Sequence, residues 1–218
     1  MNEFDKKAEQ IISCVLIPEE TDLLTKLASK AKHGIVELGP LTGRSSVYLG
    51  TIAKKNKVPM LCVDIWEDDE VYEEWGKNMV DFGLRNVVTH EKASTSEALI
   101  PESFDFLFLD ASHTTEGVKA DYERWASQMT LPATVVFHDI DRGSVRKFFE
   151  TVEGKIEEHN NVGVVFLEED KFIGERIPIT PMGEEQSRTI IGFDKDIKKG
   201  VVKELKAKKK PVNKRGKK

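Results

Sequence analysis

Short apolar runs alternate along the chain with longer stretches in which apolar residues recur at the three- and four-residue spacing of a helix. We expect the short runs to be buried strands, because such runs bounded by turn residues are typical of strands covered on both faces. The predicted strands are 35–38, 60–64, 86–90, 104–109 and 134–137. The predicted helices are 19–32, 45–54, 71–84, 116–129 and 145–152.

This alternation predicts an α/β fold with a mainly parallel sheet and helices on both faces. Two last apolar runs, 162–167 and 171–177, are separated only by the acidic turn 168–170, which predicts an antiparallel hairpin at one edge. Ligands of such sheets bind beyond the carboxyl ends of the strands, so those ends are where we look for chemistry.

Composition excludes several classes of protein. The longest stretch without a charged residue is 125–138, whose 14 residues are fewer than the roughly 20 of a membrane-spanning helix. The N-terminus leads into no apolar core of a signal peptide, and Cys14 and Cys62 are too few for a disulfide scaffold. We therefore expect a reduced, cytoplasmic protein without a membrane partner.

The net charge of −5 conceals two oppositely charged parts. Residues 195–218 carry 12 basic and two acidic side chains, a net charge of +10, and the remaining residues carry 21 basic and 36 acidic, −15. We expect a disordered, solvated tail, which could instead contact nucleic acid or an anionic lipid. The acidic body disfavours nucleic acid as its own partner.

A glycine turn follows the first predicted strand. Gly39 and Gly43 allow a tight turn and close approach of a ligand to the backbone, and Ser45 can cap the next helix. The spacing is not that of a dinucleotide fingerprint, because Leu41 and Arg44 stand where it requires glycine. An ordinary strand-to-helix turn is the alternative.

An acidic residue ends the second predicted strand. Asp64 lies 21 residues after Gly43, the separation at which a carboxylate commonly binds ribose hydroxyls. The alternatives are that Asp64 caps a helix and that Trp66 is a packed aromatic residue.

Polar residues also follow the fourth and fifth predicted strands. Asp110 and His113 follow one, and His138 and Asp139 follow the other, so neighbouring strands would bring them together. Carboxylates and imidazoles there suit a divalent cation or general acid–base catalysis. Alternatively, Asp110 caps a turn and His138 is a core histidine.

These residues resemble a known family. The segments V36-E37-L38-G39, G43-R44-S45, D64-I65-W66, D110-A111-S112-H113, E116-G117-V118-K119-A120-D121 and F137-H138-D139 are similar to class I S-adenosylmethionine-dependent methyltransferases. They are most similar to the small-molecule O-methyltransferase branch that includes macrolide-sugar methyltransferases and cephalosporin-hydroxylase-like proteins. The resemblance covers 35–149 and implies a Rossmann-like fold.

The resemblance implies a cofactor site. It assigns Glu37, Gly39 and Gly43 to the methionine and ribose part of S-adenosylmethionine, together with Asp110. It assigns Asp64 to the ribose hydroxyls, and it places Trp66 near the adenine and Ser94 at the adenine edge. Residues 34–194 would form this domain, behind a helical extension over 1–33.

The resemblance also implies a reactive centre. In metal-dependent members, the fourth-strand aspartate binds Mg²⁺ and a histidine three residues later is the base, which correspond to Asp110 and His113. The remaining ligands are two adjacent acids, where this chain has His138 and Asp139. The metal set would be Asp110, His138 and Asp139, holding Mg²⁺, a softer divalent metal or none.

Three functions follow. The first is O-methylation of a sugar or another small hydroxylated molecule. The second is a non-catalytic S-adenosylmethionine-binding module, and the third is a nucleic-acid methyltransferase anchored by the tail. Residues 66–83 form either a lid or a surface helix with an apolar face. The apolar run 11–17 either mediates a homo-oligomer or packs on the sheet.

Overall fold

The computed structural model describes residues 3–11 and 16–168, which all belong to the first of two units, Met1–Pro178. The second unit, Ile179–Lys218, lies outside the described residues, and with it the predicted basic tail. The helices are α1 (Glu3–Ala8), α2 (Pro18–Ala28), α3 (Arg44–Asn56), α4 (Asp69–Asp81), α5 (Thr115–Ala126) and α6 (Gly143–Phe149). The strands are β1 (Ile35–Leu38), β2 (Met60–Asp64), β3 (Val88–Lys92), β4 (Phe106–Leu109), β5 (Ala133–Phe137), β6 (Lys155–His159) and β7 (Val162–Leu167).

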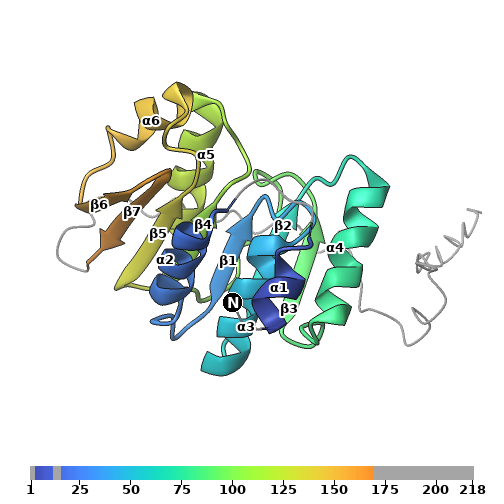
Figure 1. Ribbon diagram of the computed structural model, residues 1–218. Coiled ribbons are helices and arrows are strands. Elements are labelled where there is room, and N and C mark those ends of the chain that lie inside the picture. The colour runs from blue at the N-terminus through green and yellow to red at the C-terminus, as the bar shows by residue number, and fades with distance from the viewer. Residues whose placement is uncertain (1–2, 12–15, 169–218) are drawn as a thin grey trace, which may run out of the picture. The chain divides into compact units, whose positions relative to one another are not determined.

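The strands form one seven-stranded sheet within the described residues, in the order β3-β2-β1-β4-β5-β7-β6 (Figure 1). Strands β1 to β5 are parallel to one another, and β7 is antiparallel to both β5 and β6. The predicted α/β class with a mainly parallel sheet is confirmed. Chain order reverses between β1 and β4, the kind of position where ligands bind in open α/β sheets.

Side chains alternate between the two faces of each strand, and this alternation separates two layers of helices. Val36 and Leu38 of β1 point into the core cluster that holds Trp125 of α5 and Phe149 of α6. Glu37 lies on the opposite face, where it meets α3. Helices therefore cover both faces, as predicted.

The edge hairpin exists, but the prediction assigned the wrong strands to it. The structure pairs β6 with β7 through the two-residue turn Asn160–Asn161, whereas the prediction paired 162–167 with 171–177. Strand β6 was missed because its residues are mostly exposed and carry no apolar alternation. Residues 171–177 lie outside the described residues.

Other boundaries differ from the predicted ones by a few residues. Helix α2 ends at Ala28 rather than 32, and the chain then turns into β1 because the Asp105 carboxylate accepts hydrogen bonds from the backbone of Lys32, His33 and Gly34. Ile11 is buried within the chain itself. No helix among the described residues is both long and apolar enough to cross a bilayer.

Candidate functional site

The carboxyl edge of the sheet holds a concentration of strained backbone. Leu41, Trp66 and Asp139, which follow β1, β2 and β5, all have positive φ angles although none is glycine. Such conformations cost about 1–3 kcal/mol each and persist where surrounding contacts enforce them, often at functional sites. The strain therefore falls at the edge where the sequence predicts a ligand.

The two glycines of the predicted turn bring three elements together. Gly39 has a φ of 86°, and a Cβ there would overlap the carbonyl group of Asp110. Gly43 has a φ of 92° and precedes α3; a Cβ there would lie 2.8 Å from Cδ1 of Trp75 in α4. Both glycines are required by the protein's own packing, whether or not a ligand also approaches them.

Glu37 lies beneath this turn and is fully buried. Its Oε2 accepts hydrogen bonds from Ser46 Oγ at 2.5 Å and from the Cys62 thiol at 3.2 Å. Burial raises the pKa of Glu37 to about 7, although these hydrogen bonds oppose the rise. Its Oε1 has no hydrogen-bond partner among the described residues, which leaves a buried acceptor beside the turn.

Asp64 and Trp66 both hold the glycine turn. The Asp64 carboxylate accepts from the backbone N–H of Leu41 at 3.2 Å and of Trp66 at 2.9 Å. The Trp66 indole donates to the Leu41 carbonyl at 2.8 Å. A carboxylate has about four acceptor positions, so Asp64 keeps capacity for the ribose hydroxyls that the resemblance assigns to it.

The Trp66 ring is enclosed rather than open to a ligand. Trp66 is only 2% exposed, and its ring packs against Tyr72, Trp75 and His90. Contact with an adenine would require α4 to move. Trp75 and Met79 of α4 are also fully buried, which matches the predicted surface helix with an apolar face.

Ser94 lies in the loop after β3, partly exposed, with its Oγ 2.7 Å from Ser96 Oγ. Helix α5 holds this loop at Thr95, whose hydroxyl donates to Asp121 and whose carbonyl accepts from the Trp125 indole. The loop is therefore fixed beside the sheet edge independently of any ligand.

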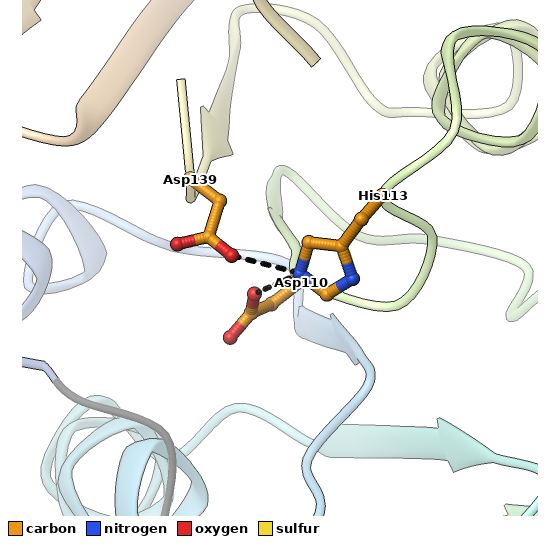
Figure 2. Close-up of side chains that lie close together, drawn as sticks. All are labelled: Asp110, His113 and Asp139. Carbon is orange, nitrogen blue, oxygen red and sulfur yellow. Dashed lines mark ion pairs between the residues drawn. The ribbon is translucent and has the colours of Figure 1, made fainter. Parts of the chain in front are cut away.

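Three of the predicted site residues converge at the ends of β4 and β5 (Figure 2). His113 Nε2 lies 2.9 Å from Asp139 Oδ2 and 3.7 Å from Asp110 Oδ1. One candidate ligand atom from each of the three lies within 4.8 Å of the others. The His113 side chain is 37% exposed, so a molecule at this edge can reach its ring.

His138 lies next to this group but faces a different direction. Its side chain is 3% exposed, with Nδ1 3.1 Å from Asp110 Oδ1 and Nε2 3.6 Å from Glu20 Oε2 in α2. The structure thus assembles Asp110, Asp139 and His113, where the prediction had placed His138 as the third ligand. Nδ1 of His138 faces Asp110 and Nε2 points away, toward α2. His138 is therefore a hydrogen-bond partner of Asp110 and not a third member of the group.

Charge pairing perturbs the pKa values of this group. Burial alone would raise the pKa of Asp110, but the adjacent rings of His113 and His138 outweigh it and hold the pKa below its usual value. The contact with Asp110 raises the pKa of His113. Burial opposes protonation of His138, yet Asp110 and the nearby carboxylates raise its pKa to about 9.

Sequence reasoning missed three participants. Arg142 Nε lies 2.6 Å from Asp139 Oδ2, and Asn161 donates to Asp139 Oδ1 at 2.9 Å. Glu20 approaches His138 from α2. Only Arg142 had a local signal, its position three residues after Asp139; Asn161 and Glu20 are brought in by tertiary packing.

The candidate metal ligands are paired with one another and with neighbouring basic side chains. Asp139 Oδ2 already contacts Arg142 and His113, and Asp110 Oδ1 contacts His138. A cation bound to Asp139 Oδ2 would have to displace the Arg142 guanidinium from that oxygen. Mg²⁺ also prefers oxygen ligands. The two carboxylates are balanced by the protein's own basic side chains.

The protein has a mainly parallel sheet covered by helices on both faces, with the candidate reactive groups at the carboxyl edge of that sheet. Residues 36–140, just under half of the chain, match a family model described as a methyltransferase domain. No curated protein matches the sequence.

Solved methyltransferases share the fold. The methyltransferase of Podospora anserina, solved with S-adenosylhomocysteine, superposes with a TM-score of 0.62 at 13% identity, over 77% of this chain and 87% of that one. The O-methyltransferase TomG of Streptomyces achromogenes, involved in tomaymycin synthesis and solved with S-adenosylmethionine, has a TM-score of 0.57 at 16% identity, over 77% and 91%. An O-methyltransferase of Bacillus cereus, solved with S-adenosylhomocysteine, has a TM-score of 0.56 at 13% identity, over 76% and 91%.

At these identities the likeness concerns the fold. The chain therefore has the Rossmann-like fold of these methyltransferases, and its residues 36–140 are similar to a methyltransferase domain.

Proposed function

We propose that this protein transfers the methyl group of S-adenosylmethionine to a hydroxyl group of a sugar or another small molecule. The observation that carries the proposal is the convergence of Asp110, His113 and Asp139 beside the glycine turn. The motif resemblance supports the small-molecule branch, and the net charge of −15 outside residues 195–218 disfavours a nucleic-acid acceptor.

The cofactor would lie along the carboxyl edge between the turn and Asp110. Glu37 Oε1 is a buried acceptor without a partner among the described residues, which fits the ammonium group of a methionyl moiety. Asp64 has acceptor capacity for the ribose, and Ser94 lies in a loop that α5 fixes. When bound, S-adenosylmethionine supplies an activated methyl group on sulfur, so the protein's main task is alignment.

His113 is suited to remove the proton of the acceptor hydroxyl. His113 Nε2 lies 2.9 Å from Asp139 Oδ2, which favours the tautomer with its hydrogen on Nε2 and leaves Nδ1 of the neutral ring to accept a proton. Asp139 is held in turn by Arg142 and Asn161, so the imidazole has a fixed orientation. Asp110 is suited to orient the hydroxyl, because its lowered pKa keeps it an ionised acceptor.

We infer that the reaction needs no divalent metal. Arg142 contacts the Asp139 carboxylate and His138 contacts the Asp110 carboxylate, so both acids are already paired with basic side chains. Treatment with EDTA should therefore leave turnover unchanged, and a requirement for added Mg²⁺ or Mn²⁺ would contradict this inference.

The test of function is a methyl-transfer assay with S-adenosylmethionine and panels of sugars and phenols, preceded by calorimetric titration with the cofactor. His113→Gln should lower kcat by roughly 100-fold or more with little change in cofactor affinity, because a general base contributes about that much. Cofactor binding without transfer to any acceptor would favour a binding module. Absence of cofactor binding by folded protein would refute the proposal.

A further inference from the structure

Glu20 is a buried acid on α2, outside the matched domain and at the edge of the reactive group. Its side chain is 4% exposed, and its Oε2 lies 3.6 Å from His138 Nε2. That ring nitrogen is buried and has no hydrogen-bond partner among the described residues. The nearest oppositely charged group that the structure offers Glu20 is therefore the ring of His138.

Helix capping explains only part of this arrangement. Glu20 Oε2 accepts a hydrogen bond from the backbone N–H of Ile17 at 3.1 Å at the start of α2; this is the glutamate half of a capping box, because the Ile17 side chain has no acceptor for the other half. Glutamine serves equally well at that position of a capping box. A cap needs neither burial nor a full charge, and a buried carboxylate is costly unless it has a partner.

The contacts form a chain from α2 to the reactive group. Glu20 faces one nitrogen of the His138 ring, and Asp110 faces the other at 3.1 Å. With a carboxylate facing each ring nitrogen, the ring cannot flip without losing both contacts. Asp110 Oδ1, which the ring holds, also lies 3.7 Å from His113.

We propose that Glu20 is a positioning residue for the reactive group: it fixes the ring of His138, and that ring fixes the Asp110 carboxylate relative to His113. This inference rests on the proposed function only in taking Asp110 and His113 as the groups that meet the acceptor. A consequence is that α2, although it precedes the matched domain, belongs to the catalytic unit.

Glu20→Gln is the selective test, because it keeps the cap and removes only the charge facing His138. Glu19→Gln is the matched control: it is the same chemical change one residue earlier in α2, at an exposed side chain. We expect Glu20→Gln to lower kcat by about 10- to 100-fold relative to Glu19→Gln, as for other residues that orient a functional ligand. The KM for S-adenosylmethionine should change by less than about twofold, since Glu37 and Asp64, which are proposed to hold most of the cofactor, are not part of this chain of contacts.

Two further measurements keep the test decisive. The ring ¹⁵N resonances of His138 in the free protein should move in Glu20→Gln and stay in place in Glu19→Gln. Glu20→Asp, which keeps the charge on a shorter arm, should recover part of the lost kcat, and it replaces Glu20→Gln if that variant does not fold. An unchanged kcat in folded Glu20→Gln overturns the positioning role, and unmoved ¹⁵N resonances overturn the contact itself. If the wild-type protein methylates nothing, the proposed function fails, while the resonance measurement still decides whether Glu20 holds His138.

Discussion

Replacing Glu37 with glutamine should change how the stability of this protein depends on pH. The pKa of Glu37 is raised from 4.5 to about 7 because the carboxyl is fully buried. One pKa unit corresponds to about 1.4 kcal/mol, so this difference amounts to roughly 3 kcal/mol between the two protonation states. The folded protein therefore keeps a proton that the unfolded chain loses between pH 4.5 and about 7.

The sign follows from that difference in bound protons. In the wild-type protein, the contribution of Glu37 to the free energy of unfolding is fully present below pH 4.5 and is lost as pH rises through about 7. Glutamine cannot ionise, so the free energy of unfolding of the variant should rise relative to that of the wild type by roughly 3 kcal/mol as the pH increases between these values. His90, whose ionisation has the opposite effect on stability, is present in both proteins, so its contribution cancels in the comparison.

The assay is urea-induced unfolding of both proteins, followed by tryptophan fluorescence, at several pH values across this window. The quantity to compare is the variant's free energy of unfolding minus that of the wild type. A difference that stays constant with pH would show that Glu37 ionises in the folded protein as it does in the unfolded chain. The argument from burial would then be wrong.

Three other predictions concern the supports of the site. Gly39→Ala should lose about 3 kcal/mol of stability in chemical denaturation, because its Cβ would overlap the Asp110 carbonyl at a positive φ. The control is Gly143→Ala, whose Cβ meets nothing within 4 Å, and equal losses in the two variants would refute the steric argument. Asp105→Ala should cost about 3 kcal/mol by leaving three backbone N–H groups without an acceptor, and an unchanged melting temperature would contradict this. Because burial lowers the pKa of His90 to about 4, its protonation in the unfolded chain should remove roughly 3 kcal/mol as pH falls from 6.5 to about 4, and His90→Phe should abolish that loss in acid-unfolding curves.

The fold was predictable because its signals are local. Four of the five parallel strands are short apolar runs with both faces covered, and they were recognised in this way. The fifth, β3, is an edge strand in which only Val88 is buried, and it was recognised from the apolar pair at 87–88. Strand β6 carries mostly exposed polar residues, so periodicity could not reveal it. The pair Asn160–Asn161, with Asn160 at a φ of 53°, is a turn signal that could have marked the hairpin.

The sequence by itself determined which groups stand at the carboxyl edge, because strand ends can be read from composition and parallel neighbours must end together. That reasoning places Asp110 beside His138 and Asp139, as the register of β4 and β5 confirms. Only the tertiary structure decided what each group contacts: it turned His138 toward Glu20, far away in the sequence, and set His113 against Asp139. The physical reason is that side-chain pairing depends on ring orientation and on how α2 packs over the sheet. Neither of these produces a periodic pattern in the sequence.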